Sequence, residues 1–306
     1  MDKALRKSTH ATYSSAQKRF KSFCDENNLC HLPASEDTLV LFVSQLYLDD
    51  LKGSSIRVYL SSVRSMHIFA GYPNPLGGPR LSLALKGAIN ESKPPVRKAP
   101  INYPLLVKLC EKSKVLPDSK LLIVAMTLGF YGCLRSGEFC LTNGEPFNES
   151  RHICLEDIEF YDTTKMFSLF LKQTKTDKAN EGVRIFVGCS ESKFCSYCSM
   201  KEYLSTKLGF TKHSPLLSDR FGVPMTKEFF VSSVKILLAL IGEDPSLFGG
   251  HSFRCGSATA ASESEFKRWE IKLMGRWKSE CFNIYLRNPK VVASFAKRLA
   301  NPINAI

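Results

Sequence analysis

The sequence predicts a mainly helical protein that contains one small antiparallel β-sheet. Apolar residues recur at helical spacing through the first hundred residues and again beyond residue 196. Three short segments between residues 153 and 187 are instead rich in β-forming residues separated by polar breaks. A length of 306 residues, with 44% hydrophobic and 23% charged side chains, allows two domains and excludes collagen, coiled coil and wholesale disorder.

Four helices are predicted before residue 91. The first two follow from apolar residues at helical spacing, namely Tyr13, Ala16, Phe20 and Phe23, then Leu39, Phe42, Val43 and Leu46. The third covers Ser54–Ala70 and stops at Gly71, and its inward face carries Ile56, Leu60, Val63 and His67. A short fourth helix covers Leu81–Asn90.

Residues 91–102 are predicted to form a basic, proline-rich linker. This boundary separates an N-terminal helical domain over residues 1–90 from a second domain over residues 103–306. Residues 1–98 hold 14 basic and 8 acidic side chains, and residues 99–306 hold 28 and 21. Both halves are therefore positive, as expected if both contact the same polyanion.

The second half is predicted to begin with helices over residues 104–113 and 119–131. The apolar stretch Leu121–Leu134 is too short to span a membrane and predicts a buried helix. Strands are predicted at residues 153–161, 166–173 and 183–187. Further helices are predicted near residues 197–208, 226–241, 252–263, 265–274, 278–287 and 290–300.

The formal net charge of +13 indicates a polyanionic partner, most simply nucleic acid, with an acidic membrane surface second. Eleven scattered cysteines, an odd number, and a polar N-terminus favour a reduced, intracellular protein. Cys195 and Cys198 form a C-x-x-C pair with Cys189 nearby. A zinc site takes four ligands, and the chain lacks a second C-x-x-C pair. The sequence therefore predicts no metal site, and we interpret these cysteines as small buried residues.

Arg135 follows the long apolar helix and opens the next one. Glu138, one helical turn later, can hold its guanidinium as a fixed, two-pronged binder of phosphate. A purely structural Arg–Glu pair is the alternative. Lys175 lies at the tip between two predicted strands, where it can reach into a groove and donate a proton. An exposed loop lysine is the alternative there.

His251 and Arg254 lie three residues apart at a predicted helix start, so their side chains share one face near free backbone N–H groups. A capping histidine with a surface arginine is the alternative. Tyr285 can act as a nucleophile toward phosphorus once nearby cations help to remove its proton. The alternative is a packed aromatic ring between Phe282 and Leu286.

A possible DNA-binding face lies on the third helix. Arg57, Ser61 and Arg64 are spaced four and three residues apart and share one face. A small hydroxyl between two arginines lets a helix approach a phosphate backbone closely, although a merely solvated face is the alternative. Further basic candidates for DNA contact are Lys86, Arg97 and Lys98.

Taken together, one ordered set of side chains resembles the tyrosine recombinase (phage integrase-like) family. The set is Arg135, Lys175, His251, Arg254, Trp277 and Tyr285. The resemblance covers the whole chain and implies a helical, SAM-like core-binding domain followed by a mixed α+β catalytic domain. The segment Gly275–Ser279 is most similar to the eukaryotic mobile-element branch, the recombinases of DIRS- and Ngaro-type retrotransposons and of Crypton elements. There Trp277 occupies the place of a second histidine in many bacterial members.

The resemblance implies that Tyr285 attacks a phosphate of duplex DNA, forms a 3′-phosphotyrosyl bond and releases a 5′-hydroxyl. It also implies that Arg135 and Arg254 stabilise the transition state. His251 would add a hydrogen-bond donor and help to take the tyrosine proton, and Lys175 would protonate the leaving oxygen. Trp277 would supply an indole N–H and pack against the phosphate.

Glu138 would orient Arg135 or His251 from behind. No cofactor, metal or ATP is implied. The implied partners are double-stranded DNA and further copies of the chain, with a tetramer at synapsis, and no membrane. The C-terminal helix could dock either within its own chain or onto a neighbouring copy, and the sequence does not decide between the two. A nuclear location follows from the implied function only. The alternatives are a type IB topoisomerase-like nicking-closing enzyme and a domesticated, catalytically inactive DNA-binding protein.

Overall fold

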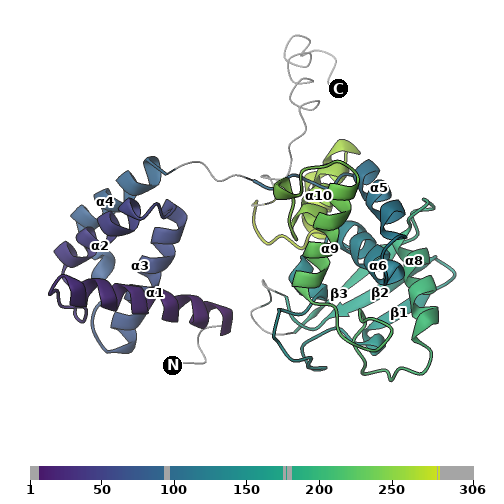
Figure 1. The fold of residues 1–306 in the computed structure, drawn as a ribbon, viewed down its shortest axis with the longest axis horizontal. Coiled ribbons are helices and arrows are strands. Elements are labelled where there is room, and N and C mark those ends of the chain that lie inside the picture. Colours follow the sequence, from purple (N-terminus) through teal and green to yellow (C-terminus); the bar gives the residue numbers. More distant parts are fainter. Residues whose placement is uncertain (1–6, 93–96, 175–176, 178–180, 281, 283–306) are drawn as a thin grey trace, which may run out of the picture. The chain divides into compact units, whose positions relative to one another are not determined.

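The structure is a computed structural model that describes residues 7–92, 97–174, 177, 181–280 and 282. The chain divides into two compact units, Met1–Val96 and Arg97–Ile306 (Figure 1). Each unit has a hydrophobic core of its own. The predicted fold class, mainly helical with one small antiparallel sheet, is confirmed.

The N-terminal unit consists of helices α1 (Lys7–Glu26), α2 (Glu36–Leu48), α3 (Gly53–Phe69) and α4 (Pro79–Asn90), with a short 3₁₀ turn over Pro75–Gly77. Most of the apolar residues noted at helical spacing lie in its core, with Phe20, Phe42 and Leu60 buried, whereas Tyr13 is half-buried. The buried imidazole of His67 accepts the Ala34 N–H through Nε2 at 2.8 Å and has the Val63 carbonyl 2.8 Å from Nδ1. This histidine therefore ties the turn before α2 to α3.

The second unit is built around α6 (Ser119–Tyr131), and nine of its thirteen residues are buried. It contacts α5, α8, α9 and α10, as expected of the longest apolar stretch in the chain. The helices of this unit are α5 (Tyr103–Ser113), α7 (Ser136–Phe139), α8 (Ser196–Leu204), α9 (Lys227–Leu240), α10 (Ser252–Glu263) and α11 (Arg268–Met274). In the described part of the chain, no helix combines the length and the apolar character that crossing a membrane requires.

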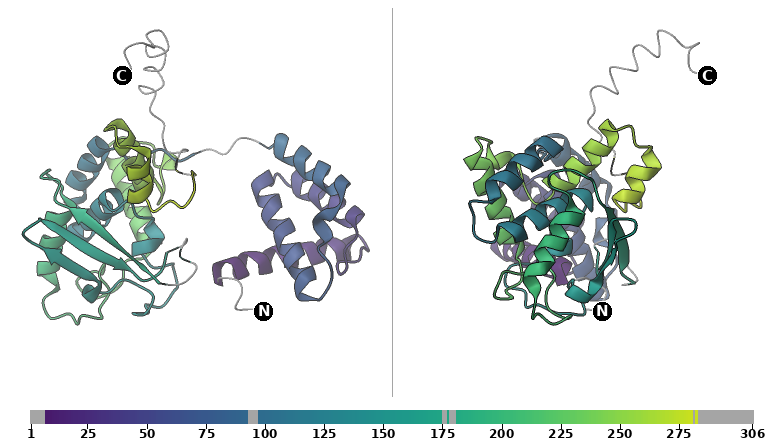
Figure 2. Two further views of the ribbon diagram at one scale, coloured as in Figure 1. Left: turned by 180° about the vertical axis from the view of Figure 1, so that it is seen from behind. Right: turned by 90° about the vertical axis from the view of Figure 1, so that its right-hand side faces the viewer.

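Three antiparallel strands form the sheet in the order β1 (Ile158–Tyr161), β2 (Met166–Leu171) and β3 (Val183–Gly188) (Figure 2). Leu169 on the central strand pairs with Ile158 on one side and Ile185 on the other. The first strand begins five residues later than predicted, because Leu155–Asp157 forms a 3₁₀ turn instead. The Asp157 carboxylate holds this turn by accepting the Cys154 N–H at 2.7 Å.

Residues 97–102, assigned above to the linker, begin the second unit. The Ala99 N–H donates to the Leu247 carbonyl at 2.7 Å, and the Ile101 N–H donates to the Ser252 carbonyl at 2.9 Å. Ile101 is fully buried in the core of this unit. Burial of this apolar side chain anchors the segment, which proline and charge content alone could not indicate.

Helix α11 begins at Arg268, three residues later than predicted. Glu265 takes a left-handed backbone conformation with φ of 60°, which interrupts helical geometry. The Lys267 N–H donates to the Glu270 carboxylate at 2.6 Å and starts the helix from there. Of the predicted helix over 278–287, only residues 278–280 and 282 are described, and the one over 290–300 lies wholly outside the described residues.

The contact between α10 and Ile101 gives a test of the packing. A Cβ atom on Gly256 would lie 1.8 Å from the Ile101 carbonyl oxygen, which is backbone and cannot rotate away. We expect Gly256→Ala to destabilise the second unit by about 3 kcal/mol. Gly87→Ala in α4 is the matched control, because its Cβ meets no atom within 4 Å. Thermal unfolding measures both; an unchanged midpoint for Gly256→Ala would refute the close packing.

Candidate active site

The turn between α6 and α7 positions Arg135. The chain leaves α6 at Tyr131, and Cys133 takes a left-handed conformation with φ of 47°. Arg135 then caps α7, with its backbone N–H donating to Glu138 Oε2 at 2.9 Å. Its guanidinium Nη1 donates to Glu138 Oε1 at 2.8 Å. One carboxylate therefore holds both the backbone and the side chain of Arg135.

Glu138 also binds a second guanidinium. Its side chain is 4% exposed, and Oε2 accepts a hydrogen bond from Arg276 Nη2 at 3.0 Å. The same arginine donates to the Gly132 and Cys133 carbonyls at 3.2 and 3.3 Å. Two arginines thus share one carboxylate, which leaves this group with a net positive charge.

Arg276 is the residue of this site that sequence reasoning missed. It lies inside the segment Gly275–Ser279, beside Trp277, the residue of that segment that the resemblance singles out. Its own type carries little signal, because a single arginine after a helix is usually solvated. A combination of a preceding glycine and a left-handed backbone, with φ of 54°, aims it back at Glu138.

Arg254 occupies the centre of the site and is 1% exposed. Its Nη1 donates to the Cys133 carbonyl at 2.6 Å, and its Nη2 donates to the Gly275 carbonyl. Its guanidinium carbon lies 4.5 Å from the ring centroid of Trp277. Burial lowers the pKa of Arg254, yet arginine titrates so high that it stays charged. The alternative of a surface arginine is therefore excluded.

Trp277 forms the layer against which Arg254 packs. It is buried with Cys133, Ala258 and Phe282 in a small separate core. A Cβ atom on Gly275 would lie 1.7 Å from the indole ring, so glycine is required there for the ring to reach this place. The structure shows the packing contact between indole and guanidinium; the expected contact with a phosphate stays a prediction.

His251 occupies the N-cap position of α10, but its side chain makes no capping hydrogen bond. His251 is exposed at the surface of the site. Protein atoms beside its ring displace part of the surrounding water, and the positive charges of Arg254, Arg135 and Lys227 act on it. Together these effects lower the pKa of His251, while Glu138 acts in the opposite direction. His251 therefore carries a neutral imidazole at neutral pH, which is able to accept a proton.

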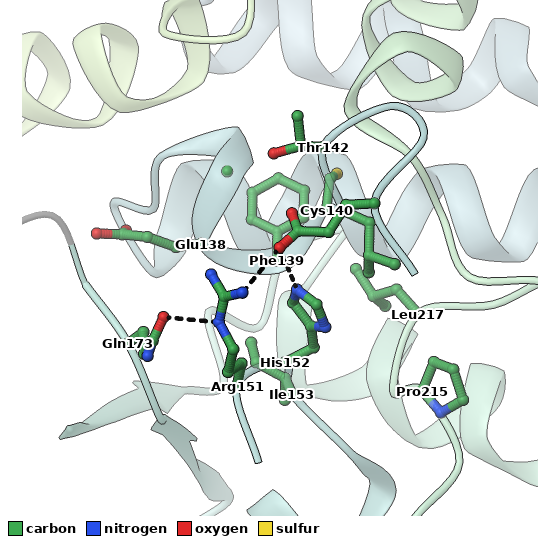
Figure 3. Close-up of a pocket in the computed structure, with 13 residues that line it drawn as sticks. Glu138, Phe139, Cys140, Thr142, Arg151, His152, Ile153, Gln173, Pro215 and Leu217 are labelled. Atoms are coloured by element: carbon green, nitrogen blue, oxygen red, sulfur yellow. Dashed lines mark hydrogen bonds and ion pairs between the residues drawn. The ribbon is translucent and has the colours of Figure 1, made fainter. Parts of the chain in front are cut away.

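A polar cavity of about 160 Å³ lies next to these residues (Figure 3). Glu138 of α7 lines one side, and Arg151, His152 and Gln173 line another. Arg151 Nε donates to Gln173 Oε1 at 3.3 Å, and its Nη1 lies 3.3 Å from Glu145 Oε1. Gln173 is the second residue after β2 and precedes Lys175 by two residues. Lys175 and Tyr285 themselves lie outside the described residues.

The candidate DNA-binding residues of the N-terminal unit are exposed. Arg57, Ser61 and Arg64 lie on the outer face of α3, and Lys86 lies on α4. Within the described residues, no carboxylate forms an ion pair with Arg57 or Arg64. In contrast, Arg19 and Arg80 of the same unit are paired with Asp49 and Asp37. The two α3 guanidinium groups are thus available to an external anion.

Arg97 and Lys98 begin the second unit. Arg97 is exposed, whereas the Lys98 amine donates to the Ser246 carbonyl at 2.6 Å. Lys98 thereby helps to fasten this segment to the loop before α10. A DNA contact by Lys98 would have to share its amine with that carbonyl.

The charges around His251 predict how its titration responds to substitution. In the DNA-free protein we expect its imidazole to titrate below the ordinary value of about 6.5. Glu138→Gln removes a negative charge and should move the midpoint further down, whereas Lys227→Met removes a positive charge and should move it up. Lys235→Met, two turns along the same helix, is the control and should leave it unchanged. Histidine ring signals in NMR spectra at low salt measure the midpoint.

The pKa of His251 is lower in the folded state than in the unfolded state. As the pH falls below about 6.5, the unfolded state therefore binds the proton more readily, and the free energy of unfolding decreases. A midpoint at or above the ordinary value, or shifts in the reverse directions, would contradict the arrangement of charges described here.

Some known proteins resemble this chain in sequence or in fold. No family model matches the chain. It is 26% identical over 298 residues to the integrase/recombinase xerD homolog of Selenomonas ruminantium. The alignment covers 92% of this chain and 81% of the relative.

Three solved structures share the fold at low sequence identity. The Tn1549 transposon integrase in complex with transposon right end DNA has a TM-score of 0.67 at 12% identity, covering 97% of this chain and 95% of that one. The XerH recombinase bound to its difH substrate has a TM-score of 0.56 at 14% identity, covering 90% and 75%. A lambda integrase dimer bound to a COC′ core site also has 0.56, at 15% identity, covering 92% and 72%. The chain is therefore similar in sequence to an integrase/recombinase homolog over most of its length. It shares with solved DNA integrases and recombinases the fold of a helical unit followed by a helical unit with a small antiparallel sheet.

Proposed function

We propose that this protein is a site-specific DNA recombinase that cuts and rejoins duplex DNA through a phosphotyrosyl intermediate at Tyr285. One observation carries the proposal. Arg135 and Glu138 act electrostatically on His251 together with Arg254, although the α7 and α10 segments are more than a hundred residues apart. A half-buried Arg135 and a buried Arg254 near the N-terminus of α10 form a site that suits a phosphate anion.

The electrostatics suit attack on a phosphodiester. The transition state carries more negative charge than the ground state, so cations held in place beforehand lower the barrier. Arg135 is held by a carboxylate, and Arg254 is held by two carbonyls and an aromatic ring. Neither has to be reorganised when DNA arrives. Within the described residues Arg254 forms no ion pair, so its charge adds to the positive potential near His251.

In the proposed reaction the Tyr285 oxygen attacks phosphorus, and His251 accepts the phenolic proton. The bond from phosphorus to the 5′-oxygen breaks, and Lys175 supplies the proton that this oxygen takes up. The 3′-phosphotyrosyl ester is then attacked by a 5′-hydroxyl in the reverse sequence. One phosphoester replaces another throughout, so the reaction requires no ATP.

We assign positioning roles to the residues behind the phosphate. The Glu138 carboxylate orients Arg135 through Oε1. Arg276 donates to Oε2 of the same carboxylate and so holds Glu138 in place. Trp277 supports the plane of the Arg254 guanidinium, in addition to the expected indole donor role.

The biological setting belongs to the same proposal. The fold shared with a transposon integrase supports an origin in a mobile element. The resemblance of Gly275–Ser279 to eukaryotic mobile-element recombinases supports the eukaryotic branch. Such an enzyme would act in the nucleus. It would assemble on DNA as a homo-oligomer, a tetramer at synapsis, as the strand exchange between two paired sites requires.

The nucleophile is tested with a nicked suicide DNA substrate built from the DNA that flanks the coding region. We expect a covalent protein–DNA adduct with the unmodified protein and none with Tyr285→Phe, whose DNA affinity should stay within about twofold because only a hydroxyl is lost. Tyr161→Phe, a half-buried tyrosine at the end of the edge strand β1, is the matched control and should form the adduct normally.

An adduct that persists in Tyr285→Phe would mean that another residue is the nucleophile. Absence of any adduct with the unmodified protein would favour a DNA-binding protein that has lost catalysis. Relaxation of a supercoiled plasmid that lacks the sites would favour a topoisomerase-like nicking and closing activity.

The α3 face is tested through the salt dependence of DNA binding. We expect Arg57→Ala combined with Arg64→Ala to weaken DNA binding. The slope of log affinity against log salt should flatten by about 2, because the loss of two phosphate contacts means that fewer counterions are released on binding. Arg57→Lys with Arg64→Lys keeps both charges and should retain the slope. An unaltered slope in the alanine variant would remove this face from the DNA interface.

A further inference from the structure

Three cysteines converge where β3 meets α8, on the second unit. Cys189 follows β3 directly, Cys195 caps α8 and Cys198 lies in the first turn of that helix. Their three sulfur atoms all lie within 4.8 Å of one another. Each of the three is a free thiol.

The spacing of the sulfur atoms fits one zinc ion. With zinc–sulfur bonds of about 2.3 Å in tetrahedral geometry, neighbouring ligand sulfurs are about 3.8 Å apart. Cys189 and Cys195 already have their Sγ atoms 3.5 Å apart. Small rotations of the side chains would therefore complete the geometry without any movement of the backbone.

The backbone brings these sulfurs together by its own hydrogen bonds. The Cys189 N–H donates to the Lys165 carbonyl at 2.7 Å, and the Ser190 N–H donates to Cys195 Sγ at 3.3 Å. The Ser192 hydroxyl lies 2.7 Å from that of Ser190 and 3.0 Å from that of Tyr131. The loop between Cys189 and Cys195 is thus ordered before any ion binds, which lowers the entropic cost of binding.

The burial of these residues does not suit a purely packing role. The interpretation from sequence, as small buried residues, fits Cys195, which is 1% exposed. Cys189 is only half-buried, and Cys198 is exposed. A free cysteine that serves as a small hydrophobic residue is normally buried, whereas a ligand that faces solvent gives an ion its path of entry.

We propose that Cys189, Cys195 and Cys198 bind one zinc ion, with a water molecule as fourth ligand on the side of Cys198. The sequence predicted no metal because it lacks a second C-x-x-C pair; here a single cysteine at the end of a strand supplies the third thiolate instead. The ion would fasten β3 and the β1–β2 turn to α8. Its role would be structural and independent of the recombination chemistry.

The test uses the full-length protein, purified under reducing conditions, stripped with a chelator and then titrated with Zn²⁺ or Co²⁺. We expect one equivalent of zinc per chain by elemental analysis. With Co²⁺ we expect a thiolate-to-metal charge-transfer band in the near ultraviolet. Zn²⁺ should also raise the thermal unfolding midpoint.

Cys198→Ser is the decisive variant, because this side chain is exposed and its loss leaves the core intact. It should weaken Co²⁺ affinity at least about tenfold and remove the stabilisation by Zn²⁺. Cys30→Ser, an exposed cysteine of the N-terminal unit, should bind metal like the unmodified protein.

Less than a tenth of an equivalent of bound zinc, a Co²⁺ spectrum without the charge-transfer band, or equal affinity in Cys198→Ser would each overturn the proposal. A disulfide between two of the three cysteines in the reduced preparation, detected by mass spectrometry, would overturn it as well. All of these measurements are made without DNA, so they stand apart from the proposed recombinase activity.

Discussion

The buried guanidinium of Arg254 is the constraint on which the rest of the site depends. A charge that is 1% exposed is costly unless its donors are satisfied. Its partners are carbonyls of two separate turns, at Cys133 and Gly275. Both turns contain a left-handed residue, Cys133 and Arg276. Arg254 therefore joins the end of α6 to the end of α11, and through them it sets the positions of α7 and Trp277.

The same turns determine the charge of the surface that they enclose. Arg135 and Arg276 meet the Glu138 carboxylate, and Arg254 is held by neutral carbonyls, so cations outnumber carboxylates at this point. Desolvation and these cations also keep the His251 imidazole neutral. An anion would be attracted to such a surface, and a base would be present beside it. Structure and proposed chemistry are connected through this one imbalance of charge.

Much of the fold could be predicted because it depends on local patterns. The spacing of Phe20, Phe42 and Leu60 indicated the N-terminal helices, and the apolar run of α6 indicated the central helix of the second unit. The pattern misled where a single long-range contact decided the outcome. Ile101 sits in the core of the second unit despite its proline-rich surroundings, and the Asp157 carboxylate converts the start of a predicted strand into a turn.

The sequence by itself determined which residue types are available: the arginines, the histidine at a helix start and the helical periods that place them. Only the tertiary structure decided which of them meet. Arg276 reaches Glu138 across 138 positions, and Cys189 joins the C-x-x-C pair through a loop held by the β1–β2 turn. The physical reason is that helical spacing depends on neighbours a few residues away. In contrast, convergence at a site depends on turns and packing between segments that are distant in the chain.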